Sequence, residues 1–376
     1  MKRRSSGVAG KETYRILISG GGSGGHIFPA IAIADALKEK RPDAEFLFVG
    51  AKGKIEMEKV PKAGYQIKGL WISGFHRGEI LRNLLFPIKL IVSLLKAYGI
   101  IRRFRPHVVV GVGGFASGPT LEVASRLGIP TVIQEQNSFP GKTNRLLASK
   151  VNKICVAYDG LERFFPKQKI VKTGNPVRKD LTAAGDRAEA LQHFGMEKDK
   201  PVVVLFGGSL GARSLNRAMR DNAELLRRHQ DVQILWQAGK LYIEEFGQCE
   251  TARLPHVKIS AFIDRMDLAY AMADVLICRA GALTIAELAL VGKPAILIPS
   301  PNVAEDHQTF NAKALTERAA ALLVKDQDAA KEMIPAALQL LNDAKQRAAI
   351  SRNIREMQQK NADERIAEEI LELIDS

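Results

Sequence analysis

Short apolar runs alternate with helix-like segments along the whole chain. None of these runs shows strict alternation of apolar and polar positions, which is typical of parallel strands covered by helices on both faces. The predicted fold class is therefore α/β, with two doubly wound, Rossmann-like domains that face each other across a cleft. The strands are predicted over Tyr14–Ser19, Glu45–Val49, His107–Val112, Thr131–Gln134 and Lys153–Val156, and again over Pro201–Phe206, Val232–Trp236, Val257–Ser260, Asp274–Cys278 and Ala295–Ile298.

The alternation breaks at Lys172–Arg178, where a Gly-Asn-Pro sequence precedes a second series of strands and helices. The length of 376 residues also fits two domains. We expect an N-terminal domain over residues 1–178 and a C-terminal domain over residues 179–350. The end of the chain, from about 351 to 376, is predicted to be helical. Apolar residues at helical spacing in Glu364–Ile374 suggest that it packs back onto the first domain.

A glycine-rich loop, Gly20–His26, follows the first predicted strand and precedes a helix expected from about Pro29. Glycines let a ligand approach the backbone, and the unpaired N–H groups of a helix start attract anions, so the loop predicts a phosphate site. A dinucleotide fold would place an acid about 20 to 30 residues later. The second strand instead runs into Gly50-Ala51-Lys52, which indicates a phosphate site of another kind.

A second loop of this type, Gly111–Gly118, is predicted at the same edge of the first domain. One diphosphate could contact both loops, although glycines at such positions can also serve only to make tight turns. In the second half, Gly207–Arg213 repeats the scheme, and Ala282–Glu287 opens a helix after a strand. The start of that helix can meet a phosphate, and Glu287 can accept hydrogen bonds from ribose hydroxyls. The alternative for Glu287 is a solvated residue that stabilises the helix dipole.

The formal charge of +14 and the pI of about 9.6 favour acidic partners: nucleic acid, anionic lipid or phosphorylated metabolites. Nucleic acid is not expected, because aromatic residues are only 6% of the chain and are not interleaved with basic ones. The three cysteines lie far apart without metal-ligand spacing, and they fit a reducing compartment as buried thiols. The first residues lack the apolar core of a signal peptide, so export is not expected.

Several motifs together resemble the MurG family of bacterial glycosyltransferases. They are Gly21–Ala30, Gln134–Asn137, Gly174–Arg178, Gly207–Ala212, and Gly281–Thr284 with Glu287, and they occur in the family's order from about residue 15 to 315. The resemblance implies a fold of the glycosyltransferase B type and inverting transfer of N-acetylglucosamine from UDP. The acceptor would be the C4 hydroxyl of undecaprenyl-diphospho-muramyl pentapeptide, in peptidoglycan synthesis. UDP-N-acetylglucosamine would be a substrate, with no cofactor or metal.

The same resemblance implies roles for individual residues. Donor-binding residues would be Ser23, Gly24, Gly25, Asn137, Arg178, Ser209, Ile263, Ala282, Leu283, Thr284, Ile285, Ala286, Glu287 and Gln308. The acceptor diphosphate would contact Gly22, His26, Gly113, Gly114 and Ser117. His26 is a candidate catalytic base, since its ordinary pKa suits proton transfer near neutral pH, but a binding or structural role is equally open. Glu135 is a second acid or base candidate, for which we expect a buried position beside a cation.

Two other functions stay open at this point. One is a UDP-N-acetylglucosamine 2-epimerase of similar fold, and the other is a non-catalytic binder of nucleotide sugars. The apolar segment Leu84–Ile101 bears on the choice, because it is interrupted by Lys89, Ser93 and Lys96 and flanked by arginines. It is too interrupted to span a membrane, but it suits peripheral binding to an anionic bilayer. The family resemblance implies that this would be the cytoplasmic face of the bacterial inner membrane. The alternative is the buried face of an ordinary domain helix.

Overall fold

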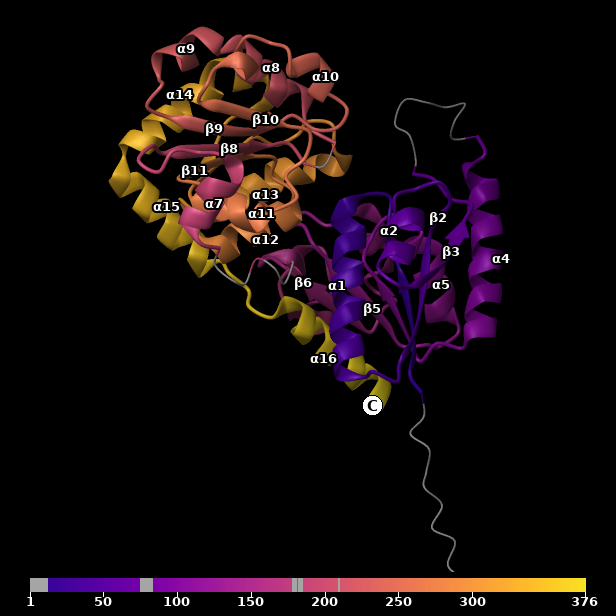
Figure 1. Cartoon of the computed structure of the whole chain (residues 1–376). Helices are drawn as coiled ribbons and strands as arrows, with labels where there is room; N and C mark the ends of the chain where they lie inside the picture. Colours follow the sequence, from indigo (N-terminus) through magenta and orange to yellow (C-terminus); the bar gives the residue numbers. More distant parts are fainter. Residues whose placement is uncertain (1–12, 75–83, 178–180, 182–184, 209) are drawn as a thin grey trace, which may run out of the picture.

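The computed structural model describes residues 13–74, 84–177, 181, 185–208 and 210–376, and it contains two α/β units (Figure 1). The first is built on a seven-stranded parallel sheet of order β3-β2-β1-β4-β5-β6-β7. Its strands are β1 (Arg15–Ser19), β2 (Glu45–Ala51), β3 (Gln66–Leu70), β4 (Val108–Gly111), β5 (Thr131–Glu135), β6 (Lys153–Val156) and β7 (Ile170–Lys172). The central strands are buried on both faces, which explains their unbroken apolar sequences.

Helices cover both faces of this sheet. They are α1 (Gly24–Lys40), α2 (Glu56–Lys62), α4 (Phe86–Phe104), α5 (Ser117–Arg126) and α6 (Lys142–Leu147). One core joins α1 to the sheet through residues such as Ile27 and Ile33, and the other joins α4 and α5 through Ala97, Ile101 and Leu121. The long helix α4 forms the outer edge of this domain (Figure 1).

The second unit has a six-stranded parallel sheet of order β10-β9-β8-β11-β12-β13. Its strands are β8 (Val202–Phe206), β9 (Gln233–Gln237), β10 (Val257–Ser260), β11 (Val275–Cys278), β12 (Ala295–Leu297) and β13 (Leu322–Leu323). Its helices are α7 (Arg187–Phe194), α8 (Arg213–Asp221), α9 (Ala223–Arg228), α10 (Ile243–Phe246), α11 (Met266–Met272), α12 (Ala282–Val291), α13 (His307–Thr316), α14 (Ala329–Asn342) and α15 (Ala344–Glu356). Single 3-10 turns occupy Leu161–Arg163, Lys167–Lys169, Thr251–Arg253, Ala304–Asp306 and Asp326–Asp328.

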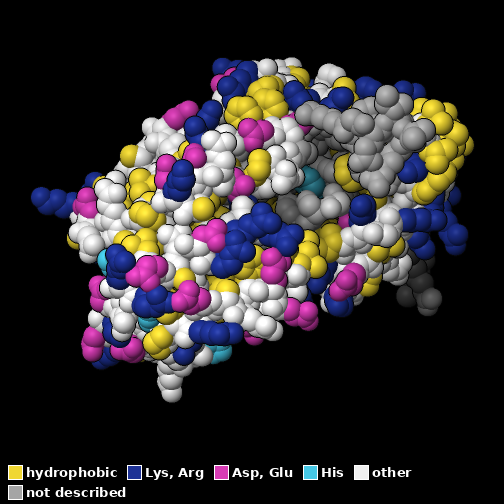
Figure 2. All heavy atoms as spheres, turned by 90° about the horizontal axis from the view of Figure 1, so that it is seen from above, with side chains coloured by type: hydrophobic (Ala, Val, Ile, Leu, Met, Phe, Trp, Pro, Cys, Tyr) yellow, Lys and Arg dark blue, Asp and Glu magenta, His cyan; other side chains and the backbone are white. Residues whose placement is uncertain are grey.

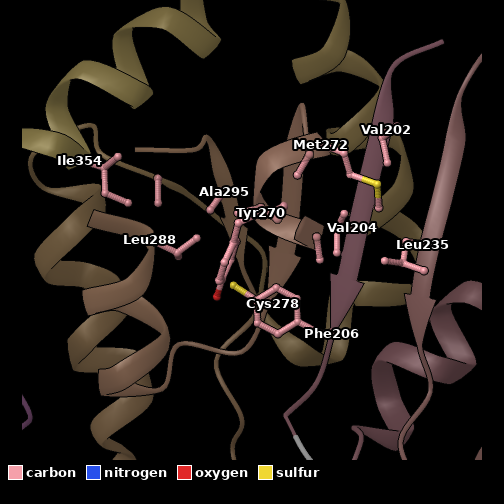
Figure 3. Packing of buried hydrophobic residues seen from close by; sticks show 14 of the residues in the cluster. Val202, Val204, Phe206, Leu235, Tyr270, Met272, Cys278, Leu288, Ala295 and Ile354 are labelled. Atoms are coloured by element: carbon pink, nitrogen blue, oxygen red, sulfur yellow. The ribbon is translucent and has the colours of Figure 1, made fainter. Parts of the chain in front are cut away.

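Apolar side chains fill the space between the second sheet and the helices on one of its faces (Figure 3). Phe206 of β8 meets the ring of Tyr270 edge-on, with the ring centres 6.0 Å apart. Cys278 of β11 is buried beside them, and Ile354 of α15 belongs to the same cluster. This core fixes α12, which carries six of the predicted donor residues, against the sheet.

The chain crosses between the two units twice, at residues 173–177 and after α15. Following α15 it returns to the first unit as α16 (Ala362–Asp375), which lies beside α1 (Figure 1). Ile366, Ala367 and Ile370 are buried in the core that α1 also lines. Lys40 and Lys153 form ion pairs with carboxylates of α16. Ile354 still packs in the second unit, so the return runs through residues 357–361.

The predicted fold class is confirmed: both sheets are parallel and both units are of the Rossmann type. Strands β3, β7 and β13 were not among the predicted ones. All three lie at a sheet edge: polar positions weaken the apolar signal in β3 and β7, and β13 is only two residues long. The first helix begins at Gly24, five residues before the expected Pro29, because Pro29 is accommodated inside the helix. No helix in the described ranges is long and apolar enough to span a membrane.

Candidate active site

The two glycine loops of the first domain touch each other at the ends of β1 and β4. Gly114 has a φ of +84°, and a Cβ atom there would lie 2.1 Å from the carbonyl oxygen of Gly21. A Cβ atom on Gly20 would similarly lie 2.2 Å from Cγ2 of Val112. Only glycine permits the close approach of the two backbones at Gly114 and Gly21, and Gly20 leaves room for the Val112 side chain. The loops that the sequence predicted at one sheet edge therefore form one continuous surface.

Glu56 lies directly beneath the first loop, at the start of α2 and five residues beyond the end of β2. The carboxylate is fully buried and accepts the backbone N–H groups of Gly22 and Ala51, each at 2.9 Å. A Cβ atom on Gly21 would lie 2.2 Å from the Glu56 carboxyl carbon. The acid after β2 thus holds the loop itself, whereas a dinucleotide fold uses its acid for a ribose. The sequence signal that could have revealed it is its place at the start of α2.

His26 is the third residue of α1, in the first turn of the helix. Its Nδ1 lies 3.1 Å from Oε1 of Gln136, and its ring lies against Gly113, where a Cβ atom would be 2.9 Å from Cε1 of the ring. Burial lowers the pKa of His26, and hydrogen bonds to Gln136 and the Val112 carbonyl together with the charge of Glu56 oppose this only in part. The ring is therefore neutral at pH 7, which is the state that can accept a proton.

The other predicted residues of these loops occupy the same surface. Ser23 is the N-cap of α1 in an extended conformation, and Gly24 and Gly25 are the first two residues of that helix. Gly113 has a φ of +90°, as its neighbour Gly114 has one of +84°. The Ser117 hydroxyl is buried and donates to the carbonyl oxygen of Gly114 at 2.9 Å. Ser117 therefore shapes the loop, and direct contact of its side chain with a diphosphate stays a prediction.

Glu135 ends β5 and is buried, as expected, but its hydrogen-bond partners in the described part of the chain are neutral amides, with no cation among them. Its Oε1 accepts the backbone and side-chain N–H groups of Asn137 at 2.9 and 3.1 Å. Its Oε2 accepts from Gly141 and from the Asn144 side chain. Burial raises the pKa of Glu135, against the opposing effect of these hydrogen bonds. The expectation of a cation beside Glu135 was wrong, because four N–H donors already surround the carboxylate.

Asn311 of α13 connects this cluster to the second domain. Its Oδ1 accepts from the backbone and hydroxyl of Ser138, at 2.9 and 3.1 Å. Its Nδ2 donates to the side chain of Asn137 at 3.1 Å and to the carbonyl of Ala280 at 3.3 Å. Because Ala280 precedes α12, one buried side chain joins the end of β5 to the start of that helix. The sequence analysis did not identify Asn311, which lies 173 residues from Ser138.

The same junction carries a second pair of contacts between the domains. Phe139 stacks on Phe310 with ring centres 4.7 Å apart, and Arg145 pairs with Glu305 at 3.1 Å. Glu305 adopts a φ of +56°, an uncommon conformation for a residue with a side chain. These two contacts join the same parts of the two domains that Asn311 connects.

Most predicted donor residues of the second domain lie on α12, which starts after the N-cap Gly281. They run from Ala282 to Glu287, and Oε2 of Glu287 accepts the Tyr270 hydroxyl at 2.8 Å. The Ile263 side chain is buried in the core, which leaves its backbone as the part able to meet a base. Gln308 accepts the backbone N–H of Ser300 at 2.8 Å through Oε1. Arg178 and Ser209 lie outside the described residues.

Arg279, which the sequence analysis did not select, anchors the segment before α12. It donates to Asp326 at 2.6 Å, to Ser214 at 2.6 Å and to the carbonyl of Ile298 at 3.0 Å. The guanidinium is largely buried, and such a charge is stable only when it is paired in this way. The arginine therefore fixes the N-terminal end of the donor helix. The only sequence signal for it is a cation at the end of a buried strand.

A cleft of about 700 Å³ lies between α1 and α12. Phe28 and Ile31 line it from α1, and Leu283 and Glu287 line it from α12, with Pro176 and Val177 of the crossing segment between them. Two predicted donor residues thus face a cavity between the domains. Among the described residues, no cluster of His, Cys, Asp or Glu is arranged to hold a metal ion.

The helix α4 presents an apolar surface to solvent. Ser93, Ala97 and Ile101 are its buried residues, whereas Ile91 and Leu95 are 58% and 68% exposed. Apolar and basic side chains gather at the edge of the molecule where α4 lies (Figure 2). The exposed apolar side chains of the segment are Leu84, Leu85, Ile88, Ile91, Val92, Leu95 and Tyr98. The predicted alternative, an ordinary buried helix face, accounts for only the smaller part of this segment.

Both domains match domains of one known glycosyltransferase family. Residues 16–156 match the glycosyltransferase family 28 N-terminal domain, and residues 202–370 match the glycosyltransferase family 28 C-terminal domain. The crystal structure of MurG from Acinetobacter baumannii superposes with a TM-score of 0.77 at 26% identity, over 96% of this chain and all of that one. A protein assigned as a UDP-N-acetylglucosamine 2-epimerase from Listeria monocytogenes, with 11% identity and a TM-score of 0.66, shares the fold alone.

The curated relatives extend over almost the full chain. The UDP-N-acetylglucosamine–N-acetylmuramyl-(pentapeptide) pyrophosphoryl-undecaprenol N-acetylglucosamine transferase of Flavobacterium psychrophilum is 52% identical over 97% of this chain and 99% of its own length. Its counterpart in Parabacteroides distasonis is 51% identical over 96% of this chain and 99% of its own. With this identity over both domains, the protein belongs to the MurG family of N-acetylglucosamine transferases.

Proposed function

We propose that this protein transfers N-acetylglucosamine from UDP to the C4 hydroxyl of undecaprenyl-diphospho-muramyl pentapeptide, with inversion at the anomeric carbon. The near full-length identity to transferases of that name carries the proposal. The arrangement of the site supports it, since the starts of α1 and α5 and the candidate base lie in the first domain, and α12 lines the cleft from the second.

The donor is proposed to bind mainly on the second domain. The N-terminus of α12, from Ala282 onwards, would face the diphosphate, and Glu287 would accept hydrogen bonds from the ribose hydroxyls. The Ile263 backbone would meet the uracil edge. Asn137 and Gln308 would hydrogen-bond the sugar, and the amide nitrogen of Gln308 has no protein partner among the described residues. Ser23, Gly24 and Gly25 would meet the donor from the first domain.

The acceptor diphosphate is proposed to lie on the two joined loops of the first domain. The N–H groups at the start of α1, with Gly22 nearby, and those around Gly113 and Gly114 would bind its oxygens. His26 would remove the proton of the C4 hydroxyl as that oxygen attacks the anomeric carbon from the side opposite UDP. As the bond to UDP breaks, Arg178, Ser209 and the start of α12 would offset the charge that develops on the leaving diphosphate. We propose that no metal or cofactor is needed.

The exposed face of α4 is proposed to bind an anionic bilayer, at the cytoplasmic face of the inner membrane where a lipid-linked acceptor would be available. The apolar residues would enter the interface, while Lys52, Lys68 and the basic end of α4 would attract anionic headgroups. Partial burial and the nearby Lys52 and Lys68 lower the pKa of Lys96, which shows that these cations lie close enough to repel one another. A cluster of this kind gains from an anionic surface.

Transfer of labelled N-acetylglucosamine from UDP to a short-chain lipid-linked muramyl peptide tests the proposal. We expect product with UDP-N-acetylglucosamine, much less with UDP-N-acetylgalactosamine, and none without acceptor. Absence of product above the acceptor-free control would overturn it. Incubation with UDP-N-acetylglucosamine alone checks the epimerase, which would release an isomerised sugar without any acceptor.

A further inference from the structure

Three amide side chains form a buried relay behind His26. Gln134 and Gln136 lie at the end of β5, and Asn175 lies in the segment that crosses to the second domain. All three are buried, with exposed fractions of 0%, 1% and 5%. Each amide has one donor end and one acceptor end, so their hydrogen bonds fix how each group is turned.

A backbone carbonyl group determines how the first amide is turned, because its oxygen can only accept a hydrogen bond. Nδ2 of Asn175 donates to the carbonyl oxygen of Gln136 at 2.8 Å. The oxygen of the Asn175 side chain consequently faces the other way and accepts from Nε2 of Gln134 at 3.0 Å. The Gln134 side-chain oxygen is then left to accept from Nε2 of Gln136.

Two further carbonyl groups fix Gln136 in the same sense. Its Nε2 donates to the carbonyl oxygen of Val112 at 2.9 Å and to that of Gln134 at 3.2 Å. Rotating the amide by half a turn would place its oxygen against these acceptors and leave them without a donor. Oε1 of Gln136 must therefore face His26, at 3.1 Å from Nδ1.

We infer that Gln136 is a positioning residue that holds His26 in the tautomer with the proton on Nδ1 and the lone pair on Nε2. Because Oε1 of Gln136 can only accept, Nδ1 must donate. The side-chain hydrogen bond of the ring is made by Nδ1, and the Val112 carbonyl lies on the same side, because a Cβ atom on the adjacent Gly113 would be 3.0 Å from Nδ1 and 3.6 Å from Nε2. His26 is partly exposed, and Nε2 is not among the buried atoms that lack a partner in the described residues. The charged group acting on the ring is Glu56, which hydrogen-bonds the adjacent loop.

The consequence for catalysis rests on the proposed function. With the proton on Nδ1, Nε2 can accept the proton of the C4 hydroxyl while the new bond from that oxygen to the anomeric carbon forms and the bond to UDP breaks. The resulting imidazolium keeps its Nδ1–H bond to Gln136. In the other tautomer Nε2 carries a proton and cannot act as a base. Gln136 would thus determine the fraction of enzyme in which Nε2 of His26 is unprotonated and can act as the base.

Nitrogen NMR of the full chain with ¹⁵N-labelled histidine tests the tautomer without any substrate. The chain has seven histidines, and the spectrum of His26→Gln identifies the signals of His26. Above its pKa we expect a protonated Nδ1 and an unprotonated Nε2. A protonated Nε2 in the unaltered protein would overturn the inference. This reading does not require the Gln136 variant to fold, and it does not depend on transfer activity.

The variant Gln136→Met keeps a similar shape and removes the acceptor. We expect its His26 signals to shift towards a mixture of tautomers, with kcat lowered roughly tenfold or more and KM for UDP-N-acetylglucosamine little changed. Gln233→Met is the matched control, since Gln233 is equally buried and bonds Glu197 far from the relay. Unchanged tautomer signals in Gln136→Met would contradict the inference. If His26→Ala retained turnover while the unaltered protein showed the expected tautomer, His26 would not be the base. The inference that Gln136 fixes the His26 tautomer would still hold.

Discussion

The carboxylate of Glu56 accepts the backbone N–H of Gly22 at 2.9 Å beneath the first glycine loop. Its second oxygen accepts the N–H of Ala51 at the end of β2, so one buried side chain joins the loop to the neighbouring strand. Replacing Glu56 by Gln turns one acceptor into a donor that faces an N–H group. We expect a loss of about 1 to 3 kcal/mol in the free energy of unfolding.

Chemical denaturation measures this loss, with Glu58→Gln as the control on the same helix. Glu58 is 59% exposed in its side chain, and its ion pairs within the described residues are the exposed ones to Lys59 and Lys62, so its exchange should change stability little. Equal stabilities of the two variants would show that Glu56 does not hold the loop.

The contact between the loops predicts different outcomes at two glycines with the same backbone conformation. Gly114 and Gly64 both have a φ of +84°, so alanine at either position brings about 1 to 3 kcal/mol of backbone strain. A Cβ atom on Gly64 meets nothing within 4 Å, whereas one on Gly114 lies 2.1 Å from the carbonyl of Gly21. We expect Gly114→Ala to be less stable than Gly64→Ala and to lose most transfer activity. Similar unfolding midpoints and rates in both would argue against a tight contact.

The lowered pKa of His26 predicts how stability depends on pH. Between that pKa and the ordinary value of 6.5, the unfolded chain binds more protons than the folded one. Stability should therefore fall as the pH drops through 6.5, and His26→Gln should remove this part of the loss. Unfolding free energies of both proteins from about pH 8 to 5 provide the measurement. Parallel curves would mean that burial does not lower the pKa of His26.

The side chain of Asn311 predicts coupling between the domain junction and the donor site. In Asn311→Ala the buried Ser138 N–H and the Asn137 oxygen lose their partners, which should destabilise the protein by about 1 to 3 kcal/mol. KM for UDP-N-acetylglucosamine should rise, because Asn311 also holds the Ala280 carbonyl before α12. Asn353→Ala is the control: Asn353 also donates to carbonyl groups, but at an exposed position. An unchanged KM in Asn311→Ala would separate the junction from the donor site.

The exposed face of α4 predicts membrane binding that can be weakened without unfolding the helix. Exchanging Ile91 and Leu95 for Ser should lower binding to anionic phospholipid vesicles while changing stability by less than about 1 kcal/mol. Lys89 and Lys96 are less suitable targets, because they donate to Ser73 and to the Gly69 carbonyl. Leu323→Ser, at an exposed position on the edge of the second sheet, is the control. If the unaltered protein, the variant at Ile91 and Leu95, and Leu323→Ser floated equally with the vesicles, the exposed face of α4 would not be the membrane-binding surface.

The strand pattern and the glycine loops were accessible from the sequence because they depend on local chemistry. Runs such as Val108–Gly111 must be apolar to lie inside a parallel sheet, and Gly113 must be glycine for its φ of +90°. The edge strand β3 escaped prediction because partial exposure removes that constraint, and β13 because two residues are too short to form a pattern. The partners of Glu135 were predicted wrongly because a buried carboxylate can be satisfied by N–H groups as well as by a cation.

The sequence by itself determined the fold class, the family and the loops at which phosphate is expected. The fold class follows from the periodicity of apolar residues, the loops from the positions of glycines, and the family from the order of short motifs. Each of these can be recognised along the chain without knowing which distant residues meet. Only the tertiary structure decided that Glu56 lies under Gly22, that Asn311 reaches Ser138, and that the amide of Gln136 faces His26 with its oxygen. Those contacts join residues 34, 173 and 110 positions apart, and their directions depend on how whole elements pack. The sequence placed His26 at the end of a glycine loop, whereas the three buried amides behind it determine which ring nitrogen can accept a proton.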